Sequence, residues 1–470
     1  MSSERNTIFA LSSGRPPAAI AVVRVSGPRA RDAVLALAGR LPQPRQATLV
    51  RLKGRSGDRT DLAAGSAIEA IDDAVVLWFP GPRSETGEDT AEFQVHGGYA
   101  VIAAVLSALG EIEGLRPAGP GEFTRRAFEN GKLDLTRVEG LADLIAAETE
   151  AQRRQAFRQL KGMLGDRAEL WRRRLTEALA LVEASIDFPE EDVVSERLIE
   201  PALATAADLD REIRGLLADS RRGEQLREGL TVAVAGPVNA GKSSIVNRLA
   251  KRPAAIVSPY AGTTRDIIEV HLDLAGFPVT VLDTAGVRDT TDPVEEEGVR
   301  RARARAGAAD LVLWVTDATV GDPAPLPSEL TKPGAPPIWL LSNKSDLVGR
   351  KCPEDASERS AEASAGLKCF RISALTGASF DDLEDGLADF AKRFFSVGTE
   401  LGLVTRERHR GALVECADAL RRACQEGVAG REDIIAEELR LAARALGRLV
   451  GRVDVEDVLD VIFRDFCIGK

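Results

Sequence analysis

The chain has few cysteines, no long apolar run and no excess of positive charge, and each of these absences excludes a class of protein. Its five cysteines form no CxxC pair and no zinc-ligand spacing, which indicates a reducing compartment rather than a disulfide scaffold. No run of about 18 apolar residues could form a membrane span, and the N-terminus lacks the apolar segment of a signal peptide. The net charge of -11 argues against a general nucleic-acid-binding surface, so such a partner would need a local basic patch. We therefore expect a cytoplasmic protein that does not associate with membranes.

The pattern of apolar residues changes three times along the 470 residues. Residues 1–130 alternate strand-like segments, such as AIAVVRVSG and DDAVVLWFPG, with a helix-like segment. Residues 131–228 and 386–470 carry apolar residues at helical spacing with few Gly or Pro, whereas residues 229–385 show the strand–turn–helix alternation of a parallel α/β domain. Because either helical segment alone would make a small core, we expect one all-α domain with the α/β domain inserted into it. Two separate helical bundles are the alternative.

A phosphate-binding loop is the most specific local motif. The strand-like run VAVAG leads into the pattern G-x-x-x-x-G-K-S, from Gly236 to Ser243, and then into a helix-like segment. The glycines let backbone N–H groups close around phosphates, Lys242 offers its charge to the β- and γ-phosphates, and Ser243 offers a hydroxyl to Mg²⁺. In this context the pattern predicts a nucleotide site, and an accidental glycine turn is the alternative.

Four further motifs follow in the same region: GTTRD, VTVLDTAG, LLSNKSD and RISAL. Their order and spacing resemble the GTPase domains of the TrmE–Era group in the Ras-like superfamily. The resemblance implies that Thr264 and Asp283 hold Mg²⁺, the latter through water, and that Gly286 senses the γ-phosphate. Asp346 can accept two hydrogen bonds that guanine supplies and adenine does not, so we expect the nucleotide to be GTP. The expected GTP site comprises Asn239, Ala240, Gly241, Lys242, Ser243, Ser244, Ser258, Pro259, Tyr260, Ala261, Gly262, Thr263, Thr264, Asp283, Thr284, Ala285, Gly286, Asn343, Lys344, Asp346, Ser373, Ala374 and Leu375.

The residue after DTAG indicates how hydrolysis departs from that of Ras-type enzymes. Val287 stands where those enzymes carry the glutamine that orients water, and a valine cannot orient it. The loop also carries no obvious arginine finger. Asn239 resembles the asparagine of potassium-activated GTPases, in which K⁺ takes the place of that arginine. The resemblance implies further K⁺ ligands at Ser258, Tyr260 and Thr263.

The acidic run DPVEEEG offers a second polar group for hydrolysis. By the same resemblance Glu295 positions the attacking water, and Lys242 is its catalytic partner at the phosphates. For Glu296 and Glu297 a solvated first helical turn is the simpler interpretation.

The resemblance extends over essentially the whole chain. The segments TIFALSS, VVRVSG, GPGEFTRRAFENGKLDLTRVEGLADLI, IDFPEED and FCIGK are similar to the MnmE (TrmE) family of tRNA modification GTPases. This implies an N-terminal α+β domain for folate binding and dimerisation, an all-α helical domain and an inserted Ras-like α/β P-loop GTPase domain. It also implies a homodimer and a flavin-dependent partner, MnmG (GidA). With that partner the family adds an aminomethyl or carboxymethylaminomethyl group to C5 of the wobble uridine of certain tRNAs, using 5-formyl- or 5,10-methylene-tetrahydrofolate.

The same resemblance assigns residues to the folate site and to the chain end. Arg24, Glu92, Lys132 and Lys470 are the implied folate contacts, although a lone Arg or Lys is usually solvated surface. Cys467 in FCIGK would stand beside the one-carbon carrier. A thiolate there could attack an electrophilic carbon or activate the uracil ring.

Two other functions stay open as alternatives. An RNA- or ribosome-associated GTPase switch without modification activity would share the GTPase motifs. Such relatives usually add a basic KH-like or second GTPase domain, and this acidic chain shows neither. Prenylation of CIGK is disfavoured, because Lys470 is not a usual last residue and the terminal helices are acidic.

Overall fold

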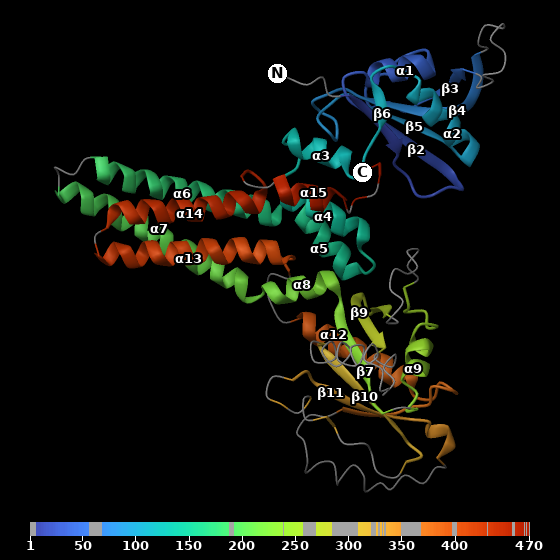
Figure 1. Cartoon of the computed structure of the whole chain (residues 1–470), viewed down its shortest axis with the longest axis vertical. Coiled ribbons are helices and arrows are strands. Elements are labelled where there is room, and N and C mark those ends of the chain that lie inside the picture. The colour runs from blue at the N-terminus through green and yellow to red at the C-terminus, as the bar shows by residue number, and fades with distance from the viewer. Residues whose placement is uncertain are drawn as a thin grey trace, which may run out of the picture. The chain divides into compact units, whose positions relative to one another are not determined.

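The computed structural model (Figure 1) divides the chain into two compact units. The first unit contains residues 1–142, 160–176 and 443–470, and the second contains residues 143–159 and 177–442. In the part of the chain that the structure describes, no helix is both long and apolar enough to cross a membrane. The described residues are 6–55, 68–187, 192–237, 239–256, 269–283, 309–320, 326–327, 330, 332, 335–348, 368–396, 402–429, 431–453, 456–464, 466 and 468–469.

The first unit is built on a six-stranded sheet in the order β3-β4-β5-β2-β1-β6. All its neighbours are antiparallel except β1 and β6, which are parallel. Strand β2 carries small and β-branched residues in alternation, so that Ala21, Val23 and Val25 are buried on one face. These residues form a core with helices α1 and α2. The strands are β1 Thr7–Leu11, β2 Ala18–Ser26, β3 Thr48–Arg55, β4 Ile68–Phe79, β5 Thr90–Gly97 and β6 Leu115–Pro117, and the helices are α1 Ala30–Ala38, α2 Tyr99–Gly110, α3 Glu122–Glu129 and α15 Glu456–Arg464.

The end of the chain packs within this first unit. Ile468 forms an isolated β-bridge with Pro120, and Phe466 lies in a small core with Leu135 and Phe463. A side chain at Gly469 would come 2.1 Å from the carbonyl oxygen of Leu11. Residues near the C-terminus therefore contact the N-terminal domain.

The second unit contains the α/β domain, whose six-stranded sheet has the order β12-β11-β10-β7-β9-β8. Its neighbours are parallel except β8 and β9, which form an antiparallel hairpin. The central strands are almost continuously apolar, because helices cover a parallel sheet on both faces. The strands are β7 Leu230–Ala235, β8 Glu269–Leu274, β9 Phe277–Asp283, β10 Leu311–Asp317, β11 Ile338–Asn343 and β12 Lys368–Arg371, and the helices are α9 Lys242–Leu249, the 3₁₀ turn η2 Ser345–Leu347 and α12 Phe380–Ser396.

Helix α12 continues across the domain boundary expected at residue 385. Leu387, Ala391 and Phe395 lie in the same core cluster as the strands of the α/β sheet. The α/β domain therefore extends to residue 396, because burial of this apolar face keeps the helix intact beyond the predicted end.

Long helices that precede and follow the α/β domain in sequence pack together. Helices α7 and α13 lie side by side in Figure 1, and the Cys424 thiol of α13 contacts the Leu203 carbonyl of α7 at 3.8 Å. Pro201 lies inside α7 rather than at its start. The α/β domain thus lies in sequence between helices α7 and α13, which contact each other within the second unit. The described helices that precede and follow it in sequence include α4 Leu135–Ala146, α5 Glu150–Leu160, α6 Met163–Asp187, α7 Asp192–Ala218, α8 Ser220–Glu228, α13 Glu407–Ala429 and α14 Glu432–Val450.

Candidate functional site

The predicted phosphate loop joins the end of β7 to the start of α9. Gly236 has a φ of 145°, and a Cβ there would lie 2.2 Å from the carbonyl oxygen of Val315. Gly241 has a φ of 93°, and its Cβ would lie 2.2 Å from Nδ2 of Asn343. Only glycine fits at either position, so the backbone of the loop is left uncovered where phosphates would approach.

Lys242 begins helix α9 and lies over the loop. Its Nζ donates to the carbonyl oxygens of Gly236 at 2.9 Å and Pro237 at 2.8 Å. Burial lowers the pKa of Lys242 from its ordinary value, and the negative charge of Asp283 opposes this shift. Backbone oxygens of the loop thus accept hydrogen bonds from the ammonium group, and phosphate oxygens could replace them.

The candidate metal ligands lie at the start of α9 and at the end of β9. Ser243 is half-buried in the first turn of α9, next to the exposed Ser244. Asp283 ends strand β9 and is 5 % exposed. A hydroxyl and a carboxylate are hard oxygen ligands of the kind that Mg²⁺ prefers, so the donor set fits that ion.

The expected potassium ligand Asn239 lies exposed in the phosphate loop with a φ of 64°. Asparagine tolerates this left-handed conformation better than most residues. The other expected K⁺ ligands and several expected nucleotide contacts lie outside the described residues. These are Ser258, Pro259, Tyr260, Ala261, Gly262, Thr263, Thr264, Thr284, Ala285, Gly286 and Glu295.

Asn343 connects the phosphate loop to the loop expected to contact the base. It ends strand β11 and is 2 % exposed. Its Nδ2 donates to the carbonyl oxygen of Ala240 at 2.9 Å, and its Oδ1 accepts from the N–H of Ala374 at 2.9 Å. Asn343 is one of the expected nucleotide contacts, and in the structure it bridges two loops of that site.

The residues expected around guanine lie beside this bridge. Asp346 is exposed and accepts a hydrogen bond from the hydroxyl of Ser373, so it retains acceptor capacity for a ligand. Lys344 donates to Asp317 at 2.6 Å. Bonds from Lys344 and then Thr319 lower the pKa of Asp317 to about 2, so this carboxylate is charged at neutral pH.

Sequence reasoning missed two residues that shape the site. Asp317 stands at the carboxyl end of the apolar strand β10, which was the available signal. Arg248 of α9 donates to the carbonyl oxygens of Ala374 at 2.9 Å and Leu375 at 3.0 Å. These bonds hold the backbone of residues 374–375 in place. The Leu375 side chain itself is 80 % exposed.

In the first unit the structure brings together two of the expected folate contacts. Arg24 on β2 stands opposite Glu92 on β5, and their side chains are ion-paired at 2.9 Å. Glu85, which sequence reasoning missed, pairs with the same guanidinium at 2.7 Å. Lys132 is exposed beyond the end of α3, while Lys470 and the expected catalytic Cys467 lie outside the described residues.

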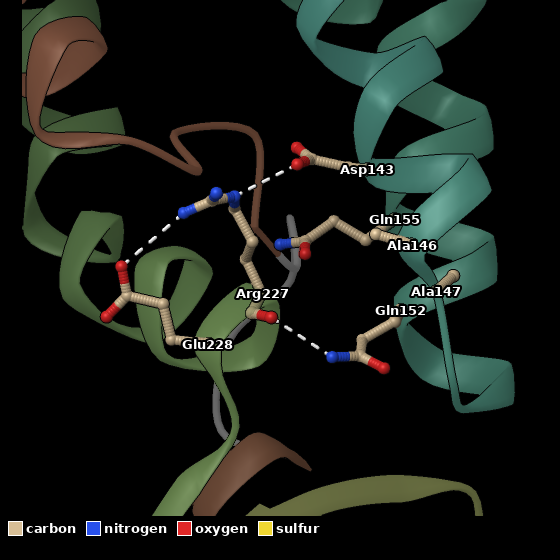
Figure 2. Close-up of a pocket in the computed structure, with 7 residues that line it drawn as sticks. All are labelled: Asp143, Ala146, Ala147, Gln152, Gln155, Arg227 and Glu228. Carbon is tan, nitrogen blue, oxygen red and sulfur yellow. Dashed lines mark hydrogen bonds and ion pairs between the residues drawn. The ribbon is translucent and has the colours of Figure 1, made fainter. Parts of the chain in front are cut away.

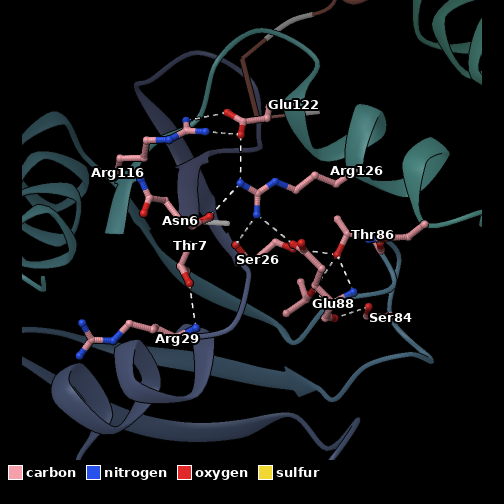
Figure 3. Close-up of polar contacts among 12 residues, drawn as sticks. Asn6, Thr7, Ser26, Arg29, Ser84, Thr86, Glu88, Arg116, Glu122 and Arg126 are labelled. Atoms are coloured by element: carbon pink, nitrogen blue, oxygen red, sulfur yellow. Dashed lines mark hydrogen bonds and ion pairs between the residues drawn. The ribbon is translucent and has the colours of Figure 1, made fainter. Parts of the chain in front are cut away.

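A buried arginine, Arg126, joins α3 to the sheet of the same unit (Figure 3). Arg126 donates to Glu88 and Glu122, each at 3.0 Å, and to the carbonyl oxygen of Asn6 at 2.8 Å. Burial alone would raise the pKa of Glu122, but bonds from Arg116, the Gly119 amide and Arg126 outweigh it and lower the pKa to about 2. These contacts hold α3 in place. No local motif predicted them.

Comparison with known proteins identifies the family. The MnmE helical domain family matches residues 135–467, and the family described as GTP-binding protein TrmE N-terminus matches residues 7–132.

Full-length relatives agree. The tRNA modification GTPase MnmE of Rhodopseudomonas palustris strain BisB18 is 56% identical over 100% of both chains, and that of Bradyrhizobium sp. strain ORS 278 is 56% identical over 99% of both. A solved structure of Aquifex aeolicus Era bound to GDP.AlF4- covers 40% of this chain and 66% of that chain at 26% identity, with a TM-score of 0.28 that is too low to add to the argument. The full-length identity and the phosphate loop together lead to one conclusion: the chain belongs to the MnmE (TrmE) family of tRNA modification GTPases, which hydrolyse GTP.

Proposed function

We propose that this chain is a K⁺-activated GTPase that acts in the cytoplasm with the flavoprotein MnmG (GidA). Together they would add an aminomethyl or carboxymethylaminomethyl group to C5 of the wobble uridine of certain tRNAs. The observation that carries the nucleotide half is the loop from Gly236 to Ser243, with Lys242 held by backbone oxygens that a phosphate can replace. The tRNA half rests on the full-length identity to relatives named tRNA modification GTPase MnmE.

In the proposed hydrolysis the chain's own residues bind, orient and supply charge. Lys242 would leave the loop carbonyls and face the β- and γ-phosphates. Ser243 directly and Asp283 through water would hold Mg²⁺, which would supply charge stabilisation at the phosphates. Thr264 and Gly286 are proposed to complete this end of the site. Asp346 discriminates guanine from adenine, because a carboxylate left without a donor would weaken binding.

Potassium is proposed to replace an arginine finger. Asn239 is the proposed side-chain ligand, together with Ser258, Tyr260 and Thr263, and it lies exposed on the phosphate loop, where an ion could reach it. Glu295 is proposed to orient the water, since Val287 cannot.

The proposed folate site lies on strands β2 and β5. The Arg24–Glu92 pair offers a carboxylate for the donor edge of a pterin and a cation for an acidic tail, and Lys132 and Lys470 would add further charge. Described residues next to Cys467 contact the N-terminal domain, which supports a role for its thiol there. The folate donor would be 5-formyl- or 5,10-methylene-tetrahydrofolate, and two copies of the chain would pair through their N-terminal domains.

The experiment is nucleoside mass spectrometry of tRNA from cells that lack the gene. The C5 modification of the wobble uridine should be absent and should return with the wild-type gene, but not with a Lys242→Ala variant. A normal nucleoside profile in the deletion strain would instead favour an RNA- or ribosome-associated GTPase switch. Replacing Na⁺ by K⁺ in a GTP hydrolysis assay on the purified chain tests the potassium part separately.

A further inference from the structure

The α/β domain is connected to the helices by two segments that touch each other. Helix α8, Ser220–Glu228, is the entering segment and leads into β7, and residues 402–406 are the returning segment that leads into α13. A Cβ on Gly223 of the entering segment would lie 2.1 Å from the carbonyl oxygen of Val404 in the returning segment. The two segments therefore run in direct backbone contact, within the second unit of the chain.

One carboxylate holds both segments. Oδ1 of Asp143, at the end of α4, accepts from Arg227 of the entering segment at 3.0 Å and from Arg406 of the returning segment at 2.6 Å. The Asp143 side chain is 14% exposed, so water screens these pairs only partly. Figure 2 shows Arg227 reaching from α8 toward this carboxylate.

One amide repeats this arrangement from helix α5. Nε2 of Gln155 donates to the carbonyl oxygens of Gly223 and Gly402, each at 3.1 Å, and the residue is 7% exposed. Gln152, one turn earlier on α5, donates to the carbonyl oxygen of Arg227 at 3.0 Å. Side chains of α4 and α5 thus bind both connections of the inserted domain.

The same helix contacts the α/β sheet directly. The N–H of Ala151 donates to the carbonyl oxygen of Gly276, in the turn between β8 and β9, at 3.0 Å. Strand β9 has seven residues from there to Asp283, a span of about 23 Å, and Asp283 is the residue that faces the nucleotide site. A single strand therefore connects the candidate metal ligand to the helix that grips the two segments.

The region where α4 and α5 meet the entering and returning segments, here called the joint, contains open space. A pocket of about 140 Å³ lies among Asp143, Gln152, Gln155, Arg227 and Glu228, as drawn in Figure 2. A second pocket of about 170 Å³ shares Gln152, Arg227 and Glu228 and reaches the β8–β9 hairpin. Elements joined by discrete polar contacts around open space can change their geometry at lower cost than elements in a close-packed apolar core.

We propose that Asp143 and Gln155 couple the nucleotide site to helix α13. They hold the entering and returning segments against α4 and α5. A displacement of Asp283 that is passed along β9 to α5 would therefore move the returning segment, and with it helix α13. They lie outside the candidate nucleotide site, so their loss should leave GTP binding and basal hydrolysis in place. What is lost is the response of the helices to the nucleotide.

The test is amide hydrogen exchange of the full chain with GDP and with a non-hydrolysable GTP analogue. In the wild type, exchange in α13 and in the phosphate loop should both differ between the two nucleotides. In Asp143→Asn and in Gln155→Leu the difference in α13 should fall at least about fivefold, in keeping with the usual size of coupling between sites, while that in the phosphate loop stays. The control is Glu438→Gln, which removes a carboxylate of α14 bonded to Arg422 of α13 at 2.8 Å, away from the joint.

Two results would overturn the proposal. One is a difference in α13 that survives in both variants as it does in the control. The other is a wild-type chain whose α13 does not respond to the nucleotide at all. If Asp143→Asn lowers the melting temperature strongly, Arg406→Lys, which keeps the charge but loses the guanidinium geometry, is judged by the same readout. Because basal hydrolysis and nucleotide affinity are measured alongside, a failure of the proposed tRNA chemistry cannot be mistaken for a failure of this coupling.

Discussion

Asn343→Ala is the sharpest test of the nucleotide site, because one buried side chain holds two loops of that site together. The change removes the donor to the Ala240 carbonyl and the acceptor for the Ala374 N–H. The Ala240 carbonyl belongs to a residue that is 1% exposed and is buried with Asn343, which is 2% exposed, whereas Ala374 is half-buried. Both loops should therefore lose the geometry that a nucleotide needs.

The magnitude follows from the two unpaired groups. A buried polar group left without its partner costs about 1–3 kcal/mol, which applies in full to the Ala240 carbonyl and only in part to the Ala374 N–H if the loops stay in place. Without nucleotide the loops can relax and recover part of this. We therefore expect nucleotide binding to weaken by about 2 kcal/mol, which is roughly 30-fold in Kd.

The assay is titration of the full chain with a fluorescent GDP. Asp381→Asn is the control, because it removes an exposed partner of Arg252 in the same domain without touching either loop. Asn343→Asp separates the two bonds: its carboxylate can still accept from Ala374 but faces the Ala240 carbonyl without a donor, so it should bind GDP more weakly than the alanine variant. A Kd within about threefold of wild type for both variants would refute the bridging argument.

Four further outcomes are expected. The pKa of Glu122 is about 2 in the folded chain and near 4.5 when unfolded, so its ionised form stabilises the fold above pH 4.5 and this stabilisation is lost as the pH falls toward 2. Glu122→Gln should therefore cost about 1–3 kcal/mol of unfolding free energy at neutral pH, after allowance for solvent screening, and much less in acid, as read from urea unfolding. Gly241→Ala should abolish GDP binding, because the new Cβ meets Asn343 in a left-handed conformation; an unchanged Kd would contradict this. GTP turnover should rise sharply when K⁺ replaces Na⁺, and Asn239→Ala should erase that difference; equal rates in both salts would reject potassium activation. Cys467→Ser should abolish tRNA modification in a reconstituted assay and leave K⁺-stimulated hydrolysis intact, so normal modification would remove the cysteine from the mechanism.

The phosphate loop was predictable because its chemistry is local. Gly236, Gly241 and Lys242 are within seven residues of one another, and the strand and helix around them carry clear apolar patterns. The structure adds the reason for each glycine, which is the closeness of Val315 and Asn343. Those neighbours come from distant strands, and no pattern in one sequence pairs them with the loop.

The helix boundary near residue 385 illustrates a different limit. Sequence periodicity indicates a helix over this region but not the core to which the helix belongs, because apolar faces look alike in either domain. Leu387, Ala391 and Phe395 join the α/β core in the structure. Tertiary packing decides such a boundary, and local propensity does not.

Asp143 marks the point beyond which sequence reasoning could not go. Its two partners, Arg227 and Arg406, are 84 and 263 residues away, and each is one of many arginines in a chain with 62 basic residues. Insertion of one domain into another forces both connections to pass through the same region, so some side chain must lie close to both. Because such a residue is bonded to both connections, any relative motion of the two must lengthen or break one of its bonds. For this reason the connections between the inserted domain and the flanking helices are where coupling residues should be sought.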